Sequence, residues 1–110
     1  MQTFDEINLN KQINKALIVL GFVKPTPIQA KTIPLLMDSS RDLIGSAQTG
    51  TGKTAAFGIP SIHLTNLSEK TTQTLILCPT RELCMQVAND LRQYSKYVEN
   101  IGIVSIYGGA

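Results

Sequence analysis

Along this chain, hydrophobic residues occur either at helical spacing or in short unbroken runs. The boundaries between these two patterns divide the sequence into predicted helices and strands. A first helix is predicted between Asn10, which suits the N-cap, and Gly21, which suits the position after a helix. Its apolar positions at helical spacing are Ile13, Ala16, Leu17 and Leu20. A second helix is predicted from Pro27 with Thr26 as its cap, and Pro34 is expected to kink or end it.

Three short apolar runs, at residues 42–46, 73–78 and 101–107, are typical of buried strands. Helices are predicted between these runs, over residues 53–66 and 81–97. Strands that alternate with helices need crossover connections, which favour a parallel sheet. We therefore expect an α/β fold in which a parallel sheet carries flanking helices.

Two further patterns refine the later helices. Gly58 and Pro60 lie inside the predicted helix at 53–66 and are expected to bend it. The helix at 81–97 presents one apolar face, formed by Leu83, Val87, Leu91 and Tyr94.

Length and composition indicate one small globular domain. The chain has 110 residues, of which 43% are hydrophobic, and its mean hydropathy is +0.06. The net charge of +2 is too small to argue for nucleic-acid binding, so any such function must rest on specific residues.

The remaining composition bears on chemistry and location. Cys78 and Cys84 match no metal-ligand spacing and are interpreted as free thiols, and His63 is interpreted as an ordinary helix residue. No apolar run is long enough to span a membrane, and the N-terminus lacks the pattern of a signal peptide. The cytoplasm is the expected location.

A glycine-rich loop between the first predicted strand and the next helix has the pattern of a phosphate-binding loop. Gly50 and Gly52 permit a tight turn, and the amides of the loop and of the new helix favour an anion. Lys53 suits the outer phosphates, and the hydroxyl of Thr54 suits magnesium. The loop consists of Ala47, Gln48, Thr49, Gly50, Thr51, Gly52, Lys53 and Thr54. Ala47 departs from the general pattern, which has glycine there.

The alternative is a glycine-rich turn that contains Gly-Lys-Thr by chance. The order of strand, loop and helix favours the phosphate loop. In a parallel sheet, ligands bind at the carboxyl ends of the strands. The segments 47–54, 79–81 and 108–109 all follow predicted strands, so we expect them to share one functional edge.

Several segments together resemble the DEAD-box RNA helicases. Residues 21–29, Gly-Phe-Val-Lys-Pro-Thr-Pro-Ile-Gln, resemble the Q motif of that family, and Phe4 resembles the isolated aromatic residue upstream of it. Residues 47–54 resemble motif I, in which alanine is usual at the first position, and residues 79–83 resemble motif Ia. Residues 108–109 resemble the glycine pair after the third strand. The resemblance covers nearly the whole chain and is greatest to bacterial members.

The resemblance implies that Gln29 recognises adenine. A carboxamide offers a donor and an acceptor, which match the pair on the edge of adenine. Taken alone, Thr26-x-x-Gln29 is equally a capping box that begins a helix. Phe22 either contacts the base or belongs to the core.

The resemblance also implies that RNA phosphates are bound by Pro79, Thr80, Arg81, Gly108 and Gly109. Arg81 suits this task because its planar group presents several donors at once. From the residues alone, Pro79-Thr80 is a helix start with a threonine cap, and the glycine pair is a turn. Such backbone contacts carry no sequence information.

Hydrolysis requires a second acidic residue at a strand end, and none of the predicted strands ends in Asp or Glu. The Asp-Glu-Ala-Asp and Ser-Ala-Thr segments of the family and its second domain are also absent. We therefore expect residues 1–110 to be the N-terminal portion of the first RecA-like P-loop domain of an ATP-dependent RNA helicase. The intact enzyme would unwind short duplexes with Lys53 and Thr54 at the reacting phosphates. The 110 residues alone would bind ATP and magnesium weakly, without turnover.

Two other hypotheses remain open at this point. One is a stand-alone, non-catalytic nucleotide-binding module, and the other is an unrelated P-loop NTPase such as a small kinase. A partial sheet would also leave an unpaired edge through which the chain is expected to dimerise.

Overall fold

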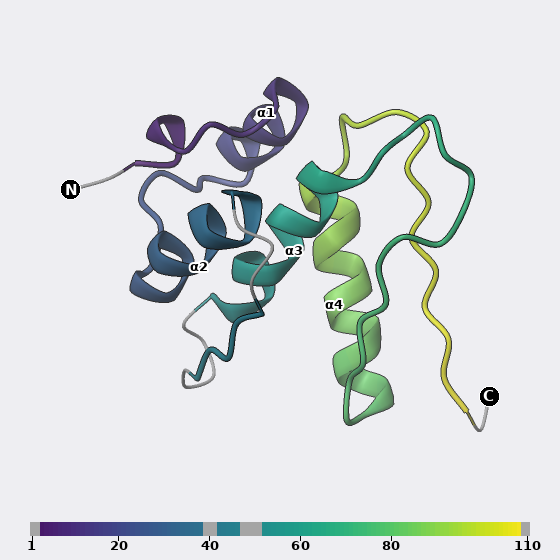
Figure 1. The fold of residues 1–110 in the computed structure, drawn as a ribbon. Coiled ribbons are helices and arrows are strands. Elements are labelled where there is room, and N and C mark those ends of the chain that lie inside the picture. The colour runs from purple at the N-terminus through teal and green to yellow at the C-terminus, as the bar shows by residue number, and fades with distance from the viewer. Residues whose placement is uncertain (1–2, 39–41, 47–51, 109–110) are drawn as a thin grey trace.

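The computed structural model describes residues 3–38, 42–46 and 52–108, and its regular elements are helical (Figure 1). They are the 3₁₀ turn η1 (Phe4–Glu6) and the helices α1 (Lys11–Val19), α2 (Pro27–Asp38), α3 (Lys53–Leu64) and α4 (Arg81–Tyr94). α3 lies between α2 and α4, and its packing against α2 is the most extensive contact between described helices. None of these helices is long and apolar enough to cross a membrane.

α1 forms as predicted. Its N-cap is Asn10, whose Oδ1 accepts a hydrogen bond from the Ile13 amide at 2.8 Å. Gly21 follows the helix with a φ of +81°, in the left-handed region that favours glycine. Of the predicted apolar face, Leu20 is an exception: it is the C-cap and is exposed, because the helix ends before it.

α2 continues to Asp38, so of the two effects expected of Pro34, a kink or an end of the helix, the second does not occur. A proline removes one backbone donor and crowds the preceding turn. Here tertiary packing outweighs that cost, because Ile33 is fully buried and the helix lies against α3. α3 likewise runs through Gly58 and Pro60, and it ends at Leu64 rather than at residue 66.

Gly58 brings α3 close to α4. A Cβ atom at this position would lie 2.5 Å from Cδ2 of Leu91. On α4, Val87, Leu91 and Tyr94 are buried as predicted, but Leu83 is 37% exposed. The reason is that Leu83 lies in the first turn of α4, which extends past α3 (Figure 1). α4 also ends at Tyr94, three residues earlier than predicted.

The hydrophobic core lies where η1 and the helices α1, α2, α3 and α4 meet. Phe22 lies half-buried against this core, with its ring centroid 5.8 Å from that of Phe4 and 5.9 Å from that of Tyr94. The amide of Phe4 donates to the carbonyl of Val23 at 3.0 Å. The upstream aromatic residue is therefore tied to the segment that leads into α2.

Residues 73–78 and 101–107 run as extended chain (Figure 1), but no β-ladder forms among the described residues of the three predicted strands. A strand is defined by hydrogen bonds to a partner strand, and an apolar run reports a tendency to be buried without naming that partner. The described part of the chain therefore does not bear out the parallel sheet.

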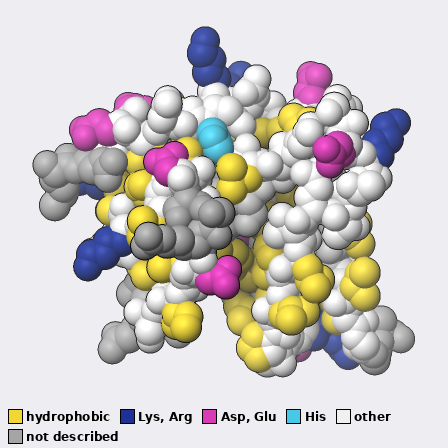
Figure 2. All heavy atoms as spheres, in the orientation of Figure 1, with side chains coloured by type: hydrophobic (Ala, Val, Ile, Leu, Met, Phe, Trp, Pro, Cys, Tyr) yellow, Lys and Arg dark blue, Asp and Glu magenta, His cyan; other side chains and the backbone are white. Residues whose placement is uncertain are grey.

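Residues 73–78 and 101–107 nevertheless have the two-residue period of strands, whereas residues 42–46 are exposed throughout, so the expected burial of that segment is not found. Ile76 and Ile103 pack against the core, whereas their neighbours Leu77 and Val104 are 84% and 79% exposed. Hydrophobic side chains accordingly gather at the surface over the half of the molecule that holds α4 (Figure 2). Both faces of these segments are apolar, as in strands that are buried on two sides.

Candidate functional site

Gln29 connects the beginnings of α2 and α3. Its side chain is almost completely buried, with 4% of its surface exposed. Its Oε1 accepts a hydrogen bond from the Thr26 amide at 2.9 Å, and its Nε2 donates to the carbonyl of Gly52 at 3.1 Å. The predicted adenine-binding residue thus contacts the last residue before α3.

Gly52 is required at its position for two reasons. Its φ is +86°, which residues with a side chain rarely adopt. A Cβ atom would also collide with Nε2 of Gln29 and would lie 3.0 Å from its Cδ. The conformation of the loop at Gly52 and the position of Gln29 therefore depend on each other.

Thr26 begins α2 only through its backbone. Its carbonyl accepts the first helical hydrogen bond from the Ala30 amide at 2.9 Å, but its hydroxyl is buried and has no hydrogen-bond partner among the described residues. The expected side-chain cap is therefore not formed. Of the two hydrogen bonds of a capping box, only the one accepted by Gln29 from the Thr26 amide is present. An unpaired buried hydroxyl is costly. The Thr26 hydroxyl oxygen lies beside Gly52, 3.1 Å from the position that a Cβ atom of residue 52 would occupy.

The N-terminus of α3 suits an anion. Gly52 is the N-cap and offers no side chain, and the first turn contains no acidic residue. Lys53 is exposed and Thr54 is half-buried in this turn. The helix dipole and Lys53 both favour negative charge here. Five residues of the predicted phosphate loop lie outside the described residues: Ala47, Gln48, Thr49, Gly50 and Thr51.

A second group of predicted residues meets at the beginning of α4. Arg81 donates through Nη2 to the carbonyl of Gly108 at 2.8 Å, and Thr80 caps α4 by accepting from the Leu83 amide at 3.1 Å. Pro79, Thr80, Arg81 and Gly108 line one cavity of about 360 Å³. The structure thus brings these residues together from two distant segments, and Gly109 lies outside the described residues.

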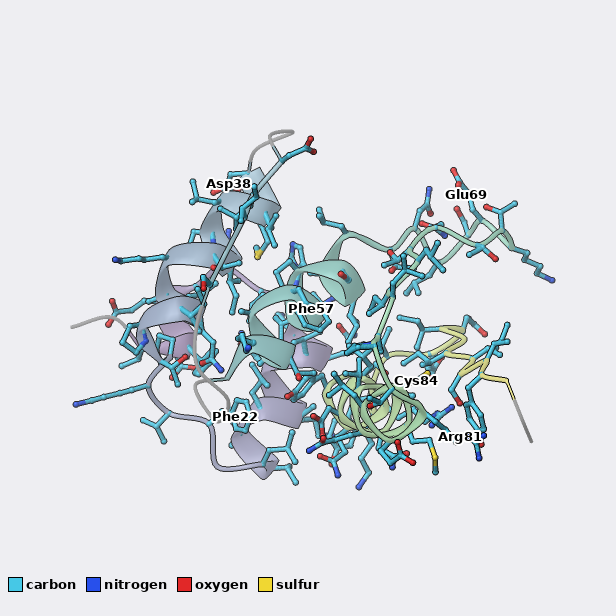
Figure 3. The ribbon with its side chains drawn as sticks, turned by 90° about the horizontal axis from the view of Figure 1, so that it is seen from below. Phe22, Asp38, Phe57, Glu69, Arg81 and Cys84 are labelled. Carbon is cyan, nitrogen blue, oxygen red and sulfur yellow. The ribbon has the colours of Figure 1, made fainter. Side chains whose placement is uncertain are left out.

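Six further residues line this cavity and were not assigned to it from the sequence: Ile76, Leu77, Cys78, Cys84, Ile106 and Tyr107. Figure 3 shows Arg81 and Cys84 at the end of α4 that faces the last extended segment. Both cysteines are free thiols, as predicted. The ring centroid of Tyr107 lies 5.3 Å from Cζ of Arg81. Tyr107 directly precedes the glycine pair, and this position was the sequence signal by which it could have been assigned to the site.

The two groups with shifted pKa values, Asp90 and Tyr94, both lie on α4. Burial raises the pKa of Asp90. Burial, and then the charge of Asp90, raise the pKa of Tyr94 to about 12. The residues of the described chain contain no cluster of three or more His, Cys, Asp or Glu side chains that could hold a metal ion.

A family model described as DEAD/DEAH box helicase matches residues 26–110. The chain belongs to this family. The ATP-dependent RNA helicase DeaD of Buchnera aphidicola subsp. Schizaphis graminum is 50% identical to it over 107 residues, which are 97% of this chain and 18% of the relative. The chain therefore spans about a fifth of the length of that curated relative.

Solved structures give the same assignment. A DEAD box protein from the hyperthermophile Methanococcus jannaschii has a TM-score of 0.93 and 43% identity, covering 100% of this chain and 30% of that one. Dbp5 of S. cerevisiae, bound to RNA and ADP BeF3, has a TM-score of 0.86 and 33% identity, covering 90% of this chain and 26% of Dbp5. The described chain thus has the backbone arrangement of part of a DEAD-box helicase.

Proposed function

We propose that this chain is the ATP-binding and RNA-contacting portion of an ATP-dependent RNA helicase. The observation that carries the proposal is the contact between Gln29 and Gly52. It places a carboxamide beside the helix N-terminus that suits a phosphate. The family membership and the name of the DeaD relative support the same activity.

In this proposal Gln29 recognises adenine with the hydrogen-bonding groups that its contacts with Thr26 and Gly52 do not use. Its carboxamide oxygen has two lone pairs and its nitrogen has two hydrogens, and the structure uses one of each. The remaining acceptor and donor match the donor–acceptor pair of adenine. Guanine has an acceptor, O6, where adenine has its amino donor, so it would leave the carboxamide oxygen of Gln29 without a donor.

The phosphates and magnesium of ATP would be held at the beginning of α3. The uncapped helix N-terminus and Lys53 would bind the outer phosphates, and the Thr54 hydroxyl would ligate magnesium. The magnesium would neutralise charge on the phosphates. The loop residues 47–51 complete this site in the proposal.

RNA would be bound at the beginning of α4. Thr80 and Arg81 would contact the sugar-phosphate backbone together with the glycine pair at 108–109. Their shared cavity and the contact between Arg81 and Gly108 support one binding edge. Dbp5, which is 33% identical to this chain, has been solved with both RNA and ADP BeF3 bound, which supports a chain that takes both ligands.

We further propose that the extended segments at 42–46, 73–78 and 101–107 belong to one parallel sheet of a RecA-like domain. Support comes from the alternating burial of residues 73–78 and 101–107 and from the exposed apolar side chains of all three segments. We also propose that the 110-residue chain by itself dimerises through this exposed apolar surface. Sedimentation velocity of the chain would show a concentration-dependent dimer, and a strict monomer would contradict the dimer.

Nucleotide selectivity provides the test of the ATP proposal. Gln29→Ala, made in the protein encoded by the complete reading frame, should lose the preference for ATP over GTP in equilibrium binding. Gln93→Ala, an exposed glutamine on α4, is the matched control and should retain the preference. Unchanged selectivity in Gln29→Ala would instead support an unrelated P-loop NTPase.

Turnover distinguishes the helicase from a non-catalytic binding module. RNA-stimulated ATP hydrolysis by the protein from the complete reading frame, abolished by Lys53→Ala, is expected. We expect residues 1–110 alone to show no turnover. Rapid magnesium-dependent hydrolysis by that chain would contradict the proposed division of the catalytic residues.

A further inference from the structure

Arg81 is held on two sides by consecutive residues of the last extended segment. Its Nη2 donates to the carbonyl of Gly108 at 2.8 Å, and its Cζ lies 5.3 Å from the ring centroid of Tyr107. This distance is within the range of a cation–π interaction. Tyr107 remains 37% exposed, so its ring covers one side of the guanidinium at the surface.

Such restraint matters for phosphate binding. A free arginine side chain has many rotamers, and fixing one of them upon binding lowers affinity. The contact with Gly108 uses one guanidinium donor, and the other donors remain for a phosphate. An aromatic face orients the guanidinium plane without consuming any of these donors.

We infer that Tyr107 is a positioning residue that orients Arg81 for contact with the RNA backbone. This inference rests on the proposed RNA-binding function of Arg81. It assigns to Tyr107 a role that depends on its aromatic face rather than on its hydroxyl. Phenylalanine should therefore replace tyrosine, whereas leucine, which fills similar space without that face, should not.

The test measures binding of a fluorescein-labelled single-stranded oligouridylate by anisotropy, in the presence of a non-hydrolysable ATP analogue. The protein is expressed from its complete reading frame. Tyr107→Leu should raise Kd about two- to fivefold, the effect of losing one exposed cation–π contact. Tyr107→Phe should bind like the unmodified protein. Tyr107→Gln repeats the test if the leucine variant aggregates.

Tyr97→Leu is the matched control. Tyr97 also accepts cation–π contacts, from Lys15 at 4.5 Å and from Lys96 at 5.7 Å, but it does not line the cavity of Arg81. This variant should retain the RNA affinity. Thermal melting of every variant identifies effects that come from stability alone.

A double-mutant comparison separates positioning from general structure. Arg81→Ala should weaken RNA binding and reduce the slope of log K against log salt by about 0.7, the value for one single-strand phosphate contact. In that background, Tyr107→Leu should have no further effect, because there is no guanidinium left to orient.

The outcomes distinguish a failure of the Tyr107 inference from a failure of the proposed RNA-binding function of Arg81. If Arg81→Ala leaves RNA affinity unchanged, the proposed RNA role of Arg81 fails, and the role of Tyr107 fails with it. If Arg81→Ala weakens binding but Tyr107→Leu does not, only the positioning role is overturned. An equal loss from Tyr107→Leu with and without Arg81 also overturns it.

Discussion

Nε2 of Gln29 donates a hydrogen bond to the carbonyl of Gly52 at 3.1 Å and joins two helix N-termini that are separated by 23 residues in sequence. The same glycine has a positive φ and leaves no space for a side chain. The contact therefore couples the residue expected to read the base to the loop expected to hold the phosphates. A substitution at either residue should therefore alter the position of the other.

Gly52→Ala should lower both stability and nucleotide affinity. The left-handed conformation alone costs a residue with a side chain about 1–2 kcal/mol, and the new Cβ would also displace Gln29. Urea unfolding and ATP titration measure the two effects. The matched control is Gly21→Ala, because Gly21 has a similar φ of +81° and no atom within 4 Å of its Cβ position.

The comparison of Gly52→Ala with Gly21→Ala tests the coupling between Gly52 and Gln29. Gly21→Ala should lose only the conformational part of the stability and should keep its ATP affinity. The excess cost of Gly52→Ala should shrink in a Gln29→Ala background, where the colliding side chain is absent. An equal loss of stability from the two substitutions would show that the contact between Gly52 and Gln29 does not contribute to stability.

Gly58→Ala should destabilise the packing of α3 against α4. Alanine improves helix propensity by about 1 kcal/mol, but its Cβ would lie 2.5 Å from Cδ2 of Leu91 and overpacking costs about 1–3 kcal/mol. We expect a net loss of stability in urea unfolding. In a Leu91→Ala background the same change should be neutral or stabilising. A stabilising Gly58→Ala in the otherwise unmodified chain would contradict this account.

The helices were largely predictable because their signals are local. Asn10 and Thr80 each cap the helix that was predicted to start after them, and periodicity located the buried faces. The errors arose where tertiary contacts outweigh local rules. Pro34 remains inside α2 because that helix packs on α3, and Leu83 is exposed because α4 extends past α3.

The sheet and the candidate sites show the limit of the same reasoning. An apolar run predicts an extended, buried segment, but its ladder depends on partners that the run does not specify. Gln29 and Arg81 were identified from their motifs, whereas their contacts with Gly52 and Gly108 depend on the fold. Tyr107 was missed because its significance comes from the position of Arg81.

Thr80→Ala should have two separable consequences. Loss of the cap to the Leu83 amide should cost about 1 kcal/mol in urea unfolding. If Thr80 also contacts RNA, affinity for single-stranded RNA should fall, and Thr80→Ser should preserve both properties. Asn10→Ala removes the equivalent cap of α1 and is the matched control. A similar fall in RNA affinity in that control would attribute the effect to stability rather than to a contact.

Stability should fall in alkaline solution through Tyr94. Burial and the charge of Asp90 raise the pKa of Tyr94 from 10.0 to about 12 in the folded chain. Between these values the unfolded chain has released the phenolic proton and the folded chain has not. The unfolded state then binds fewer protons, so stability decreases as pH rises from 10 to about 12, and the contribution is fully present below pH 10.

Urea midpoints measured at several values across that range would test this linkage. Tyr94→Phe should reduce the alkaline loss, since phenylalanine retains the buried ring but has no proton to release. Asp90→Asn should give an intermediate result, because it removes the smaller cause of the raised pKa and leaves burial in place. Each variant is compared with its own midpoint at neutral pH, which separates packing effects from titration. An alkaline loss in Tyr94→Phe equal to that of the unmodified chain would assign the effect to other groups.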